Sequence, residues 1–335
     1  MRELGKKLIL RSWLWFFPLL INAQALELSM TSLVGGDFEL SWSQGALHVS
    51  DDLLEWKEVV GAASPYLVGA GSSPQFFKVV LIPIDVFVLT GQSNALHKAR
   101  NYSPYNSTVI SGKVVFAEGN GTANAGHPTI YDHWNAVAAA GRTIGSIWEF
   151  ARELENSSYQ SEVAWALTGS GGRPAWEWRN GGRKTELENA LDTLIADLES
   201  TGRQPTVRAL IVNQGEREAA TGQNWASAWS TTFAHFRARY GNQVQIYIQS
   251  LNDLGLMGQA AESPAWTLTK SRQHSLDVDS GSSPLANTWV IDGDVTGTDS
   301  ANARDGVHYS DLGQEIIGVA TFQKFQLNNP HLFSN

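Results

Sequence analysis

The chain has 335 residues, a formal net charge of −9 and a sequence pI near 5.4. This length suffices for one large core, or for one core with a small additional module. The acidic balance, with no basic cluster beyond the N-terminus, argues against nucleic acid or an anionic membrane as a partner. The sequence contains no cysteine, which excludes disulfides, a lipid-modified cysteine and thiolate metal sites.

Residues Met1 to Ala25 are typical of a cleavable secretory signal. Basic residues precede an apolar run, Trp13–Ile21, and Ala23-Gln24-Ala25 fits the small-residue pattern for cleavage after Ala25. The alternative, an uncleaved N-terminal anchor, is disfavoured because the apolar run is short for a membrane span. We therefore expect a secreted or periplasmic bacterial protein that has no membrane attachment after signal cleavage.

Residues 26–82 form a predicted unit of their own, a small antiparallel β module. Apolar and polar residues alternate there in short runs, as in half-buried strands, with turn signals between the runs. The pattern resembles short β modules appended to secreted bacterial hydrolases, a resemblance that carries no activity. Trp42 and Trp56 could form a sugar platform, but core positions are the favoured interpretation in so small a domain. The predicted strands are Phe38–Trp42, Leu47–Ser50 and Gln75–Val80.

Residues 83–330 form a second predicted domain, in which apolar strand patterns alternate with helical patterns. Such alternation predicts a parallel sheet that is covered by helices on both faces, that is, a three-layer α/β fold. The predicted strands are Asp85–Leu89, Glu162–Leu167, Val207–Val212, Val244–Ile248 and Thr288–Ile291, and the predicted helices are Gly145–Leu154, Lys184–Leu198, Trp225–Tyr240, Pro264–Asp277 and Ser310–Phe325.

Four segments of this domain carry candidate catalytic residues. The ends of parallel strands gather at one edge of a sheet, where open α/β sheets bind ligands. Ser93 becomes a nucleophile only beside a base, a role that His308 could fill, while Asp305 could hold the imidazole in one tautomer. Each segment alone is compatible with an ordinary turn or a surface pair, but the set is harder to obtain by chance. The segments are Gly91–Asn94, Gly169–Gly172, Gln214–Glu216 and Asp305–His308.

Acyl transfer also needs hydrogen-bond donors that face the oxyanion of a tetrahedral intermediate. The backbone N–H of Ser93, the backbone N–H of Gly171 and the side-chain amide of Gln214 are the expected donors. A glycine suits the second position because the backbone must approach the substrate closely.

The four segments resemble those of the SGNH (GDSL-type) hydrolases, and specifically the sialate O-acetylesterase-like branch, carbohydrate esterase family 6. The resemblance covers roughly Asp85 to Phe325, and Trp178 falls where the family often has a tryptophan. It implies an SGNH-type, flavodoxin-like fold and a Ser93–His308–Asp305 triad. The blocks that carry it are Gly-Gln-Ser-Asn at 91–94, Gly-Gly at 171–172, Gln-Gly-Glu at 214–216 and Asp-x-x-His at 305–308.

Three residues, at two places in the chain, depart from that family pattern. Arg173 follows the glycine pair, where the family commonly has threonine or serine, and Arg217-Glu218 replace Ser-Asp after Gln-Gly-Glu. Arg173 could bind the carboxylate of a uronic or sialic acid. A salt bridge from Arg173 to Glu216 or Glu218 is the favoured alternative. The departures bear on the substrate rather than on the reaction.

Further residues are expected around the site in supporting or substrate-binding roles. Glu216 is assigned a structural role there, in preference to the alternative that it orients His308. No metal or cofactor is predicted, because the spacing of Asp292, Asp294 and Asp299 does not complete a calcium loop. The supporting set comprises Gln92, Asn94, Gly172, Arg173 and Glu216, and His97 and His127 could border the pocket.

The sequence therefore predicts a secreted serine esterase that removes O-acetyl groups from carbohydrates through an acyl-enzyme on Ser93. The acetylated oligo- or polysaccharide could be acetylxylan, another plant or algal polysaccharide, or a sialic acid. One alternative is a carbohydrate-binding protein without turnover, which retention of all three triad residues disfavours. Another is an SGNH lipase or thioesterase that prefers longer acyl chains, which the Gln-Gly-Glu block disfavours.

Overall fold

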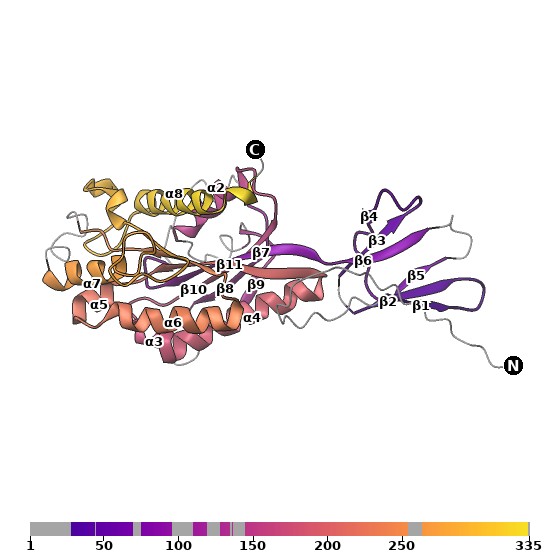
Figure 1. Ribbon diagram of the computed structural model, residues 1–335, viewed down its shortest axis with the longest axis horizontal. Coiled ribbons are helices and arrows are strands. Elements are labelled where there is room, and N and C mark those ends of the chain that lie inside the picture. The colour runs from indigo at the N-terminus through magenta and orange to yellow at the C-terminus, as the bar shows by residue number, and fades with distance from the viewer. Residues whose placement is uncertain are drawn as a thin grey trace. The chain divides into compact units, whose positions relative to one another are not determined.

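The computed structural model divides into two compact units (Figure 1). The first, the β unit, holds the described residues up to Pro83 together with Ala196–Gln204, and the second, the α/β unit, holds Ile84–Ile195 and the chain from Pro205 onward. The predicted signal segment, His97 and His127 lie outside the described residues. The structure describes residues 28–43, 45–69, 75–95, 110–118, 128–134, 136, 145–253 and 263–333.

The β unit contains two small antiparallel sheets. Its strands are β1 (Leu28–Ser32), β2 (Phe38–Trp42), β3 (Ala46–Ser50), β4 (Lys57–Glu58), β5 (Tyr66–Val68) and β6 (Phe76–Val80). They are ordered β1-β2-β5 and β4-β3-β6, and Leu40, Leu47 and Val68 form the shared core. Both tryptophans of this unit are half-buried, and the Nζ of Lys78 lies 4.2 Å from the ring centroid of Trp56. A cation therefore covers one of the two rings considered for a sugar platform.

The sheet of the α/β unit has seven strands: β7 (Ile82–Gly91), β8 (Val114–Glu118), β9 (Thr129–Tyr131), β10 (Glu162–Gly169), β11 (Arg203–Asn213), β12 (Gln245–Gln249) and β13 (Thr288–Ile291). Their order is β13-β12-β11-β7-β10-β8-β9. β10 pairs in parallel with β7 and β8, β12 does so with β11 and β13, and the edge strand β9 is antiparallel to β8. The predicted α/β fold with a mostly parallel sheet is confirmed, although the sequence patterns did not predict β8 or β9.

Helices cover both faces of this sheet: α2 (Ile147–Glu155), α3 (Trp176–Asn180), α4 (Gly182–Ser200), α5 (Glu216–Thr221), α6 (Trp225–Tyr240), α7 (Pro264–His274) and α8 (Asp311–Asn328). Figure 1 shows α2 and α8 on one side of the sheet and α3, α4 and α6 on the other. Asn224 and Ser310 cap α6 and α8, since their side-chain oxygens accept from backbone N–H groups of the first turns. No described helix has the length and apolar character needed to cross a membrane.

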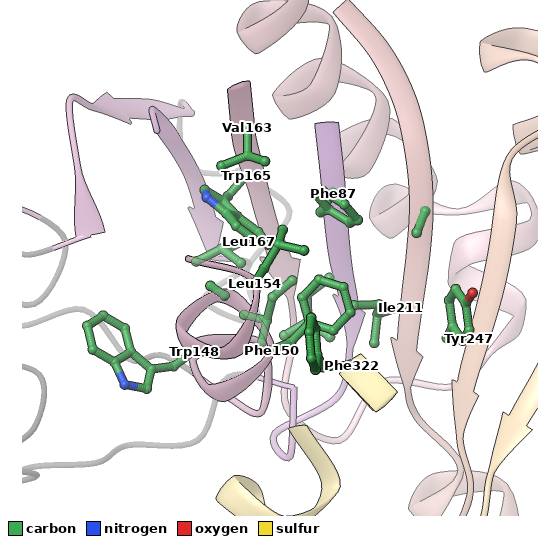
Figure 2. Close-up of a cluster of buried hydrophobic side chains, with 14 of the residues drawn as sticks. Phe87, Trp148, Phe150, Leu154, Val163, Trp165, Leu167, Ile211, Tyr247 and Phe322 are labelled. Atoms are coloured by element: carbon green, nitrogen blue, oxygen red, sulfur yellow. The ribbon is translucent and has the colours of Figure 1, made fainter. Parts of the chain in front are cut away.

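The main core lies between the sheet and the helices α2 and α8 (Figure 2). Alternate residues of the strands, such as Phe87 and Trp165, point to this face and stack with ring centroids 5.2 Å apart. Phe150 of α2 packs on Phe87, and Phe322 of α8 packs on Phe150, at centroid distances of 5.3 and 6.0 Å. This aromatic cluster, the sheet–α2–α8 core, fixes the sheet and the last helix to each other.

Strand β7 is the point at which the strand order reverses, because the chain builds the sheet first on one side of it and then on the other. Its neighbours are β10 and β11, so the turns after these three strands meet at one edge. Ligands of open α/β sheets bind at such a switch point. The fold thus brings together three of the four predicted segments.

Candidate active site

The turn after β7 is tied to both neighbouring strands. The N–H of Gln92 donates to Asn213 O at 2.9 Å, and Gly91 O accepts from the N–H of Ser170 at 2.9 Å. Gly91 has a φ of +145°, and a Cβ there would lie 1.9 Å from Asn213 O. Only glycine allows the backbone at position 91 to lie this close to Asn213. The turn therefore holds Ser93, two residues further on, at the edge of the sheet.

Ser93, His308 and Asp305 form a continuous hydrogen-bonded array. The Oγ of Ser93 lies 2.8 Å from Nε2 of His308, and Nδ1 of His308 lies 2.9 Å from both carboxylate oxygens of Asp305. The serine follows β7, whereas the other two come from the loop that precedes α8. The structure thus brings together the three residues of the predicted triad from segments more than 200 positions apart.

The carboxylate of Asp305 is half-exposed, with a side-chain exposure of 47%, but it is firmly held. Its Oδ1 accepts from the backbone N–H groups of Val307 and His308, each at 2.9 Å. Partial burial acts to raise the pKa of Asp305, but these N–H groups and the imidazole together hold the pKa well below its usual range. The carboxylate of Asp305 is therefore ionised in the folded protein near neutral pH.

Asn94 connects the serine turn to the histidine loop. Its Oδ1 accepts from the N–H of Tyr309 at 3.1 Å, and its Nδ2 donates to Val307 O at 3.0 Å. These two partners flank His308 on either side. A second bond from Nδ2 goes to Oε1 of Glu216, which fixes the amide in this orientation. The buried Asn94 side chain thus sets the position of the imidazole relative to Ser93 without touching it.

The remaining predicted residues at this edge lie close to the serine. An added Cβ at Gly171 would lie 3.8 Å from the Cβ of Ser93, so this backbone borders the hydroxyl directly. Within the described part of the chain, neither the N–H of Ser93 nor that of Gly171 has an acceptor. Gln92 is buried, and its Oε1 accepts from the N–H groups of Gly215 and Arg217 at 3.2 and 3.3 Å.

Gln214 does not occupy the role expected for it. Its Nε2 donates to Oε2 of Glu218 and, at 3.3 Å, to Arg173 O, while its Oε1 accepts from the indole of Trp229 at 2.8 Å. The side chain is buried with every polar group engaged, so it offers no N–H to an oxyanion in this structure. The amide instead links α5 and α6 beneath the site.

The expected salt bridge of Arg173 is also different. Its guanidinium lies 3.5 Å from Glu177 Oε1, four residues further on, rather than against Glu216 or Glu218. Glu216 is engaged with Asn94, and Glu218 accepts from the N–H of Ala175 at 2.5 Å. The two glutamates that were expected to pair with Arg173 therefore accept hydrogen bonds from neutral donors instead.

Trp178 supports the strand that carries the serine. Its indole N–H donates to Oγ1 of Thr90 at 2.8 Å, and that oxygen also accepts from the hydroxyl of Thr168 at 2.9 Å. Thr90 lies three residues before Ser93 at the end of β7. The tryptophan is buried and so acts on the strand end rather than on a ligand.

The array opens into a cleft of about 690 Å³. Arg217 is the one lysine or arginine among its described lining residues, and its exposed guanidinium has no acidic partner in the described part of the chain. Arg173 is not among the lining residues. They are Gln92, Ser93, Gly171, Gly172, Glu216, Arg217, Ala219, Ala220, Ser263, Ala265, Trp266, Val307 and His308.

Two of the three aspartates considered for calcium, Asp292 and Asp294, contact a lysine instead. Nζ of Lys270 lies 2.9 Å from Asp253 and Asp292 and 2.5 Å from Asp294. Asp299 caps a short turn by accepting from the N–H of Ala301. Among the residues that the structure describes, no group of three or more His, Cys, Asp or Glu side chains could hold a metal ion.

Comparison with known proteins identifies the class and then the family. The α/β fold with its mostly parallel sheet is SGNH-like, and a family model described as carbohydrate esterase, sialic acid-specific acetylesterase (SASA) matches residues 83–326. Because that match spans more than half of the chain, the protein belongs to this family of carbohydrate esterases. No curated protein sequence matches the chain.

Solved structures agree with this fold. NanS superposes with a TM-score of 0.52 at 14% identity, over 75% of this chain and all of that one (100%). A carbohydrate acetylesterase from Xanthomonas citri gives 0.50 at 17% identity, over 87% and 70% of the two chains. A protein from Arabidopsis thaliana gives 0.50 at 14% identity, over 73% and 98%. At these identities the likeness supports the fold alone.

Proposed function

We propose that this protein is a secreted serine esterase that removes O-acetyl groups from carbohydrates through an acetyl-enzyme on Ser93. The single observation that carries the proposal is the Ser93–His308–Asp305 array at the edge of a cleft. Family membership gives the class of reaction, namely ester hydrolysis on an acetylated carbohydrate. Secretion rests on the signal-like residues Met1 to Ala25.

The array suits both halves of an acyl transfer. His308 Nε2 accepts the proton of Ser93 Oγ while Oγ attacks the carbonyl carbon of the acetyl group. Asp305 stabilises the imidazolium that forms. The oxyanion of the tetrahedral intermediate accepts hydrogen bonds from the backbone N–H groups of Ser93 and Gly171. The imidazolium then protonates the leaving sugar oxygen. In the second half, His308 deprotonates water, which attacks the acetyl carbon and releases acetate as Ser93 regains its proton.

The cleft supports an acidic sugar as a substrate alongside a neutral one such as acetylxylan. Arg217 places an unpaired guanidinium in the wall beside Ser93, and a guanidinium binds a carboxylate with two parallel hydrogen bonds. Replacing Arg217 by Ala or Lys separates the two substrate classes. We expect Arg217→Ala to raise KM about tenfold or more for an acetylated sialic or uronic acid, to leave acetylated xylan unaffected, and Arg217→Lys to be intermediate.

Hydrolysis of p-nitrophenyl acetate by the wild type and by Ser93→Ala tests the proposal. We expect the variant to lose at least about a thousandfold in kcat, because the nucleophile is absent, while its circular dichroism stays unchanged. Ser263→Ala is a matched control, since Ser263 lines the same cleft but takes no part in the array. Equal rates for wild type and Ser93→Ala would refute the assignment. Faster turnover of octanoyl than of acetyl esters would refute the acetyl preference.

A further inference from the structure

A second cavity lies beside the one that contains Ser93. Its volume is about 270 Å³, and it shares no lining residue with the catalytic cleft. The short helix α5 contributes to both walls, with Glu218 facing this cavity and Arg217, Ala219 and Ala220 facing the cleft. The lining residues are Ala175, Trp176, Arg179, Glu218, Gln223, Asn224, Ser227 and Ala228.

Trp176 stands out among the tryptophans of the described residues. Its side chain is 45% exposed, whereas the others are buried or half-buried. An added Cβ at Gly181 would lie 3.2 Å from Cζ3 of Trp176, so the ring rests against the backbone at the end of α3. This support holds an aromatic surface at the mouth of the cavity at little cost in side-chain entropy.

The rim of the cavity consists of long or polar side chains that are free to bind a ligand. Arg179, Gln223, Asn224 and Ser227 are all exposed. Asn224 uses its Oδ1 to cap α6, which leaves its amide N–H groups available. In the described part of the chain, the guanidinium of Arg179 and the amide of Gln223 have no partner. The guanidinium can donate to sugar hydroxyls, and the amide of Gln223 can both donate to them and accept from them.

The lining of the cavity includes one buried carboxyl group, that of Glu218. Glu218 is 1% exposed, and its carboxyl accepts from the N–H of Ala175 and from the amide of Gln214. This buried carboxyl opposes a phosphate or another anion entering deeply, because a like charge in a poorly solvated site is costly. The combination of an exposed indole, hydroxyl-binding groups and a buried carboxyl is suited to a neutral polyol ring.

We propose that this cavity is a second carbohydrate-binding site, which takes one pyranose residue of the glycan outside the catalytic cleft. The C–H bonds of one sugar face would lie on the electron-rich face of Trp176, and the ring hydroxyls would bond to the rim. The identity of the ligand as the glycan substrate rests on the proposed function. The site itself rests on geometry that the Ser93 array does not share.

Binding of sugars that carry no acetyl group tests this site separately from catalysis. Ser93→Ala protein is titrated with unacetylated xylohexaose and, in a second arm, with 3′-sialyllactose, by calorimetry and by tryptophan fluorescence. We expect saturable binding of the neutral xylohexaose, with affinity reduced about five- to tenfold by Trp176→Ala, and weaker binding of the anionic 3′-sialyllactose. Leu327→Ala, an exposed apolar truncation on α8, is the matched control and should leave the affinity unchanged.

Further variants keep the test decisive if one substitution disturbs the fold. Gln223→Ala and Ser227→Ala should each weaken the same sugar, and Trp176→Phe should retain part of the affinity. None of these changes should alter kcat for p-nitrophenyl acetate, whereas KM for the longer acetylated glycan should rise. Absence of xylohexaose binding, tighter binding of 3′-sialyllactose than of xylohexaose, or equal affinity with and without Trp176, would overturn the second site. Failure of p-nitrophenyl acetate hydrolysis would instead overturn the esterase proposal.

Discussion

The sheet–α2–α8 core is fully buried and the edge that carries Ser93 is only partly buried, and the two regions are stabilised by different interactions. In the core, the rings of Phe87, Phe150 and Trp165 contact one another in stacked, tilted and edge-to-face arrangements, without a hydrogen bond between them. At the edge, the buried side chains of Asn94 and Gln92 form hydrogen bonds with the backbone of neighbouring loops. Packing in the core is non-directional, whereas each hydrogen bond at the edge fixes the position of one loop. A substitution in the core should therefore lower the stability of the protein, and a substitution at the edge should lower kcat.

The largest effect is expected at the edge, from Asp305→Asn. The amide cannot stabilise an imidazolium and favours the wrong tautomer of His308, so kcat should fall about a thousand- to ten-thousandfold while the fold persists. Steady-state kinetics with p-nitrophenyl acetate measures this loss. Asp299→Asn is the control, because asparagine caps a turn as well as aspartate does. A near-normal rate for Asp305→Asn would exclude the carboxylate from the mechanism.

The next effect is expected in the core, from Phe150→Ala. The ring is fully buried and contacts Phe87, Phe322 and Phe325, so its removal leaves a cavity. We expect a loss of about 3–5 kcal/mol in the free energy of unfolding. Urea denaturation gives that value, and kcat per folded molecule should be unchanged. A large drop in kcat with normal stability would show that the two regions do not separate in this way.

A third, smaller effect is expected from Asn94→Ala, which cuts the link between the two loops of the array. The imidazole should lose its fixed position, so kcat should drop about 10- to 100-fold with KM nearly constant. Asn94→Asp keeps the acceptor for the N–H of Tyr309 but brings a second carboxylate against Glu216. Its kcat should therefore stay below that of the wild type. Wild-type kcat in Asn94→Ala would contradict the positioning role.

The smallest effect is the dependence of stability on pH through Asp305. Its folded-state pKa is held below the unfolded value near 3.9, so the stabilisation is present above about pH 4 and is lost as the pH falls through the folded-state pKa. Because the side chain is 47% exposed, solvent screens the interaction and the contribution is at most about 1 kcal/mol. The difference in Tm between wild type and Asp305→Asn should shrink on acidification from pH 7 to pH 2. A difference that grows would reverse the assigned sign.

Much of the fold could be predicted because local patterns specify it. Buried runs such as Asp85–Leu89 and Glu162–Leu167 end in glycine turns, and the strands appear where those runs stand. The sequence patterns did not predict β8, Val114–Glu118, although its apolar run is followed by glycines at 119 and 121 in the same way as the predicted strands. β9 was not predicted because three residues at an antiparallel edge carry almost no pattern.

The hydrogen-bond partners around the site were harder to predict than its members. The sequence placed Ser93, His308 and Asp305 in one group, and the structure brings them together. Gln214 and Arg173 instead pair with Glu218 and Glu177, each four residues further along the chain. A side chain four residues away can pair with its partner without the entropy cost of ordering a long loop, whereas a partner across the cleft requires that loop to be ordered. The roles expected for Gln214 and Arg173 therefore differ from the partners that these side chains have in the structure.

The turn at Gly91 has a consequence for the reshaping of this protein by directed evolution. A single added carbon at position 91 would overlap Asn213 O, so a library that randomises this codon should return glycine alone. At Gly171 the same carbon would make ordinary contact with Ser93, 3.8 Å away. Two glycines that border one serine therefore have opposite mutational tolerance. Position 171 is the one at which small side chains could narrow the space for the acyl group while the backbone stays intact.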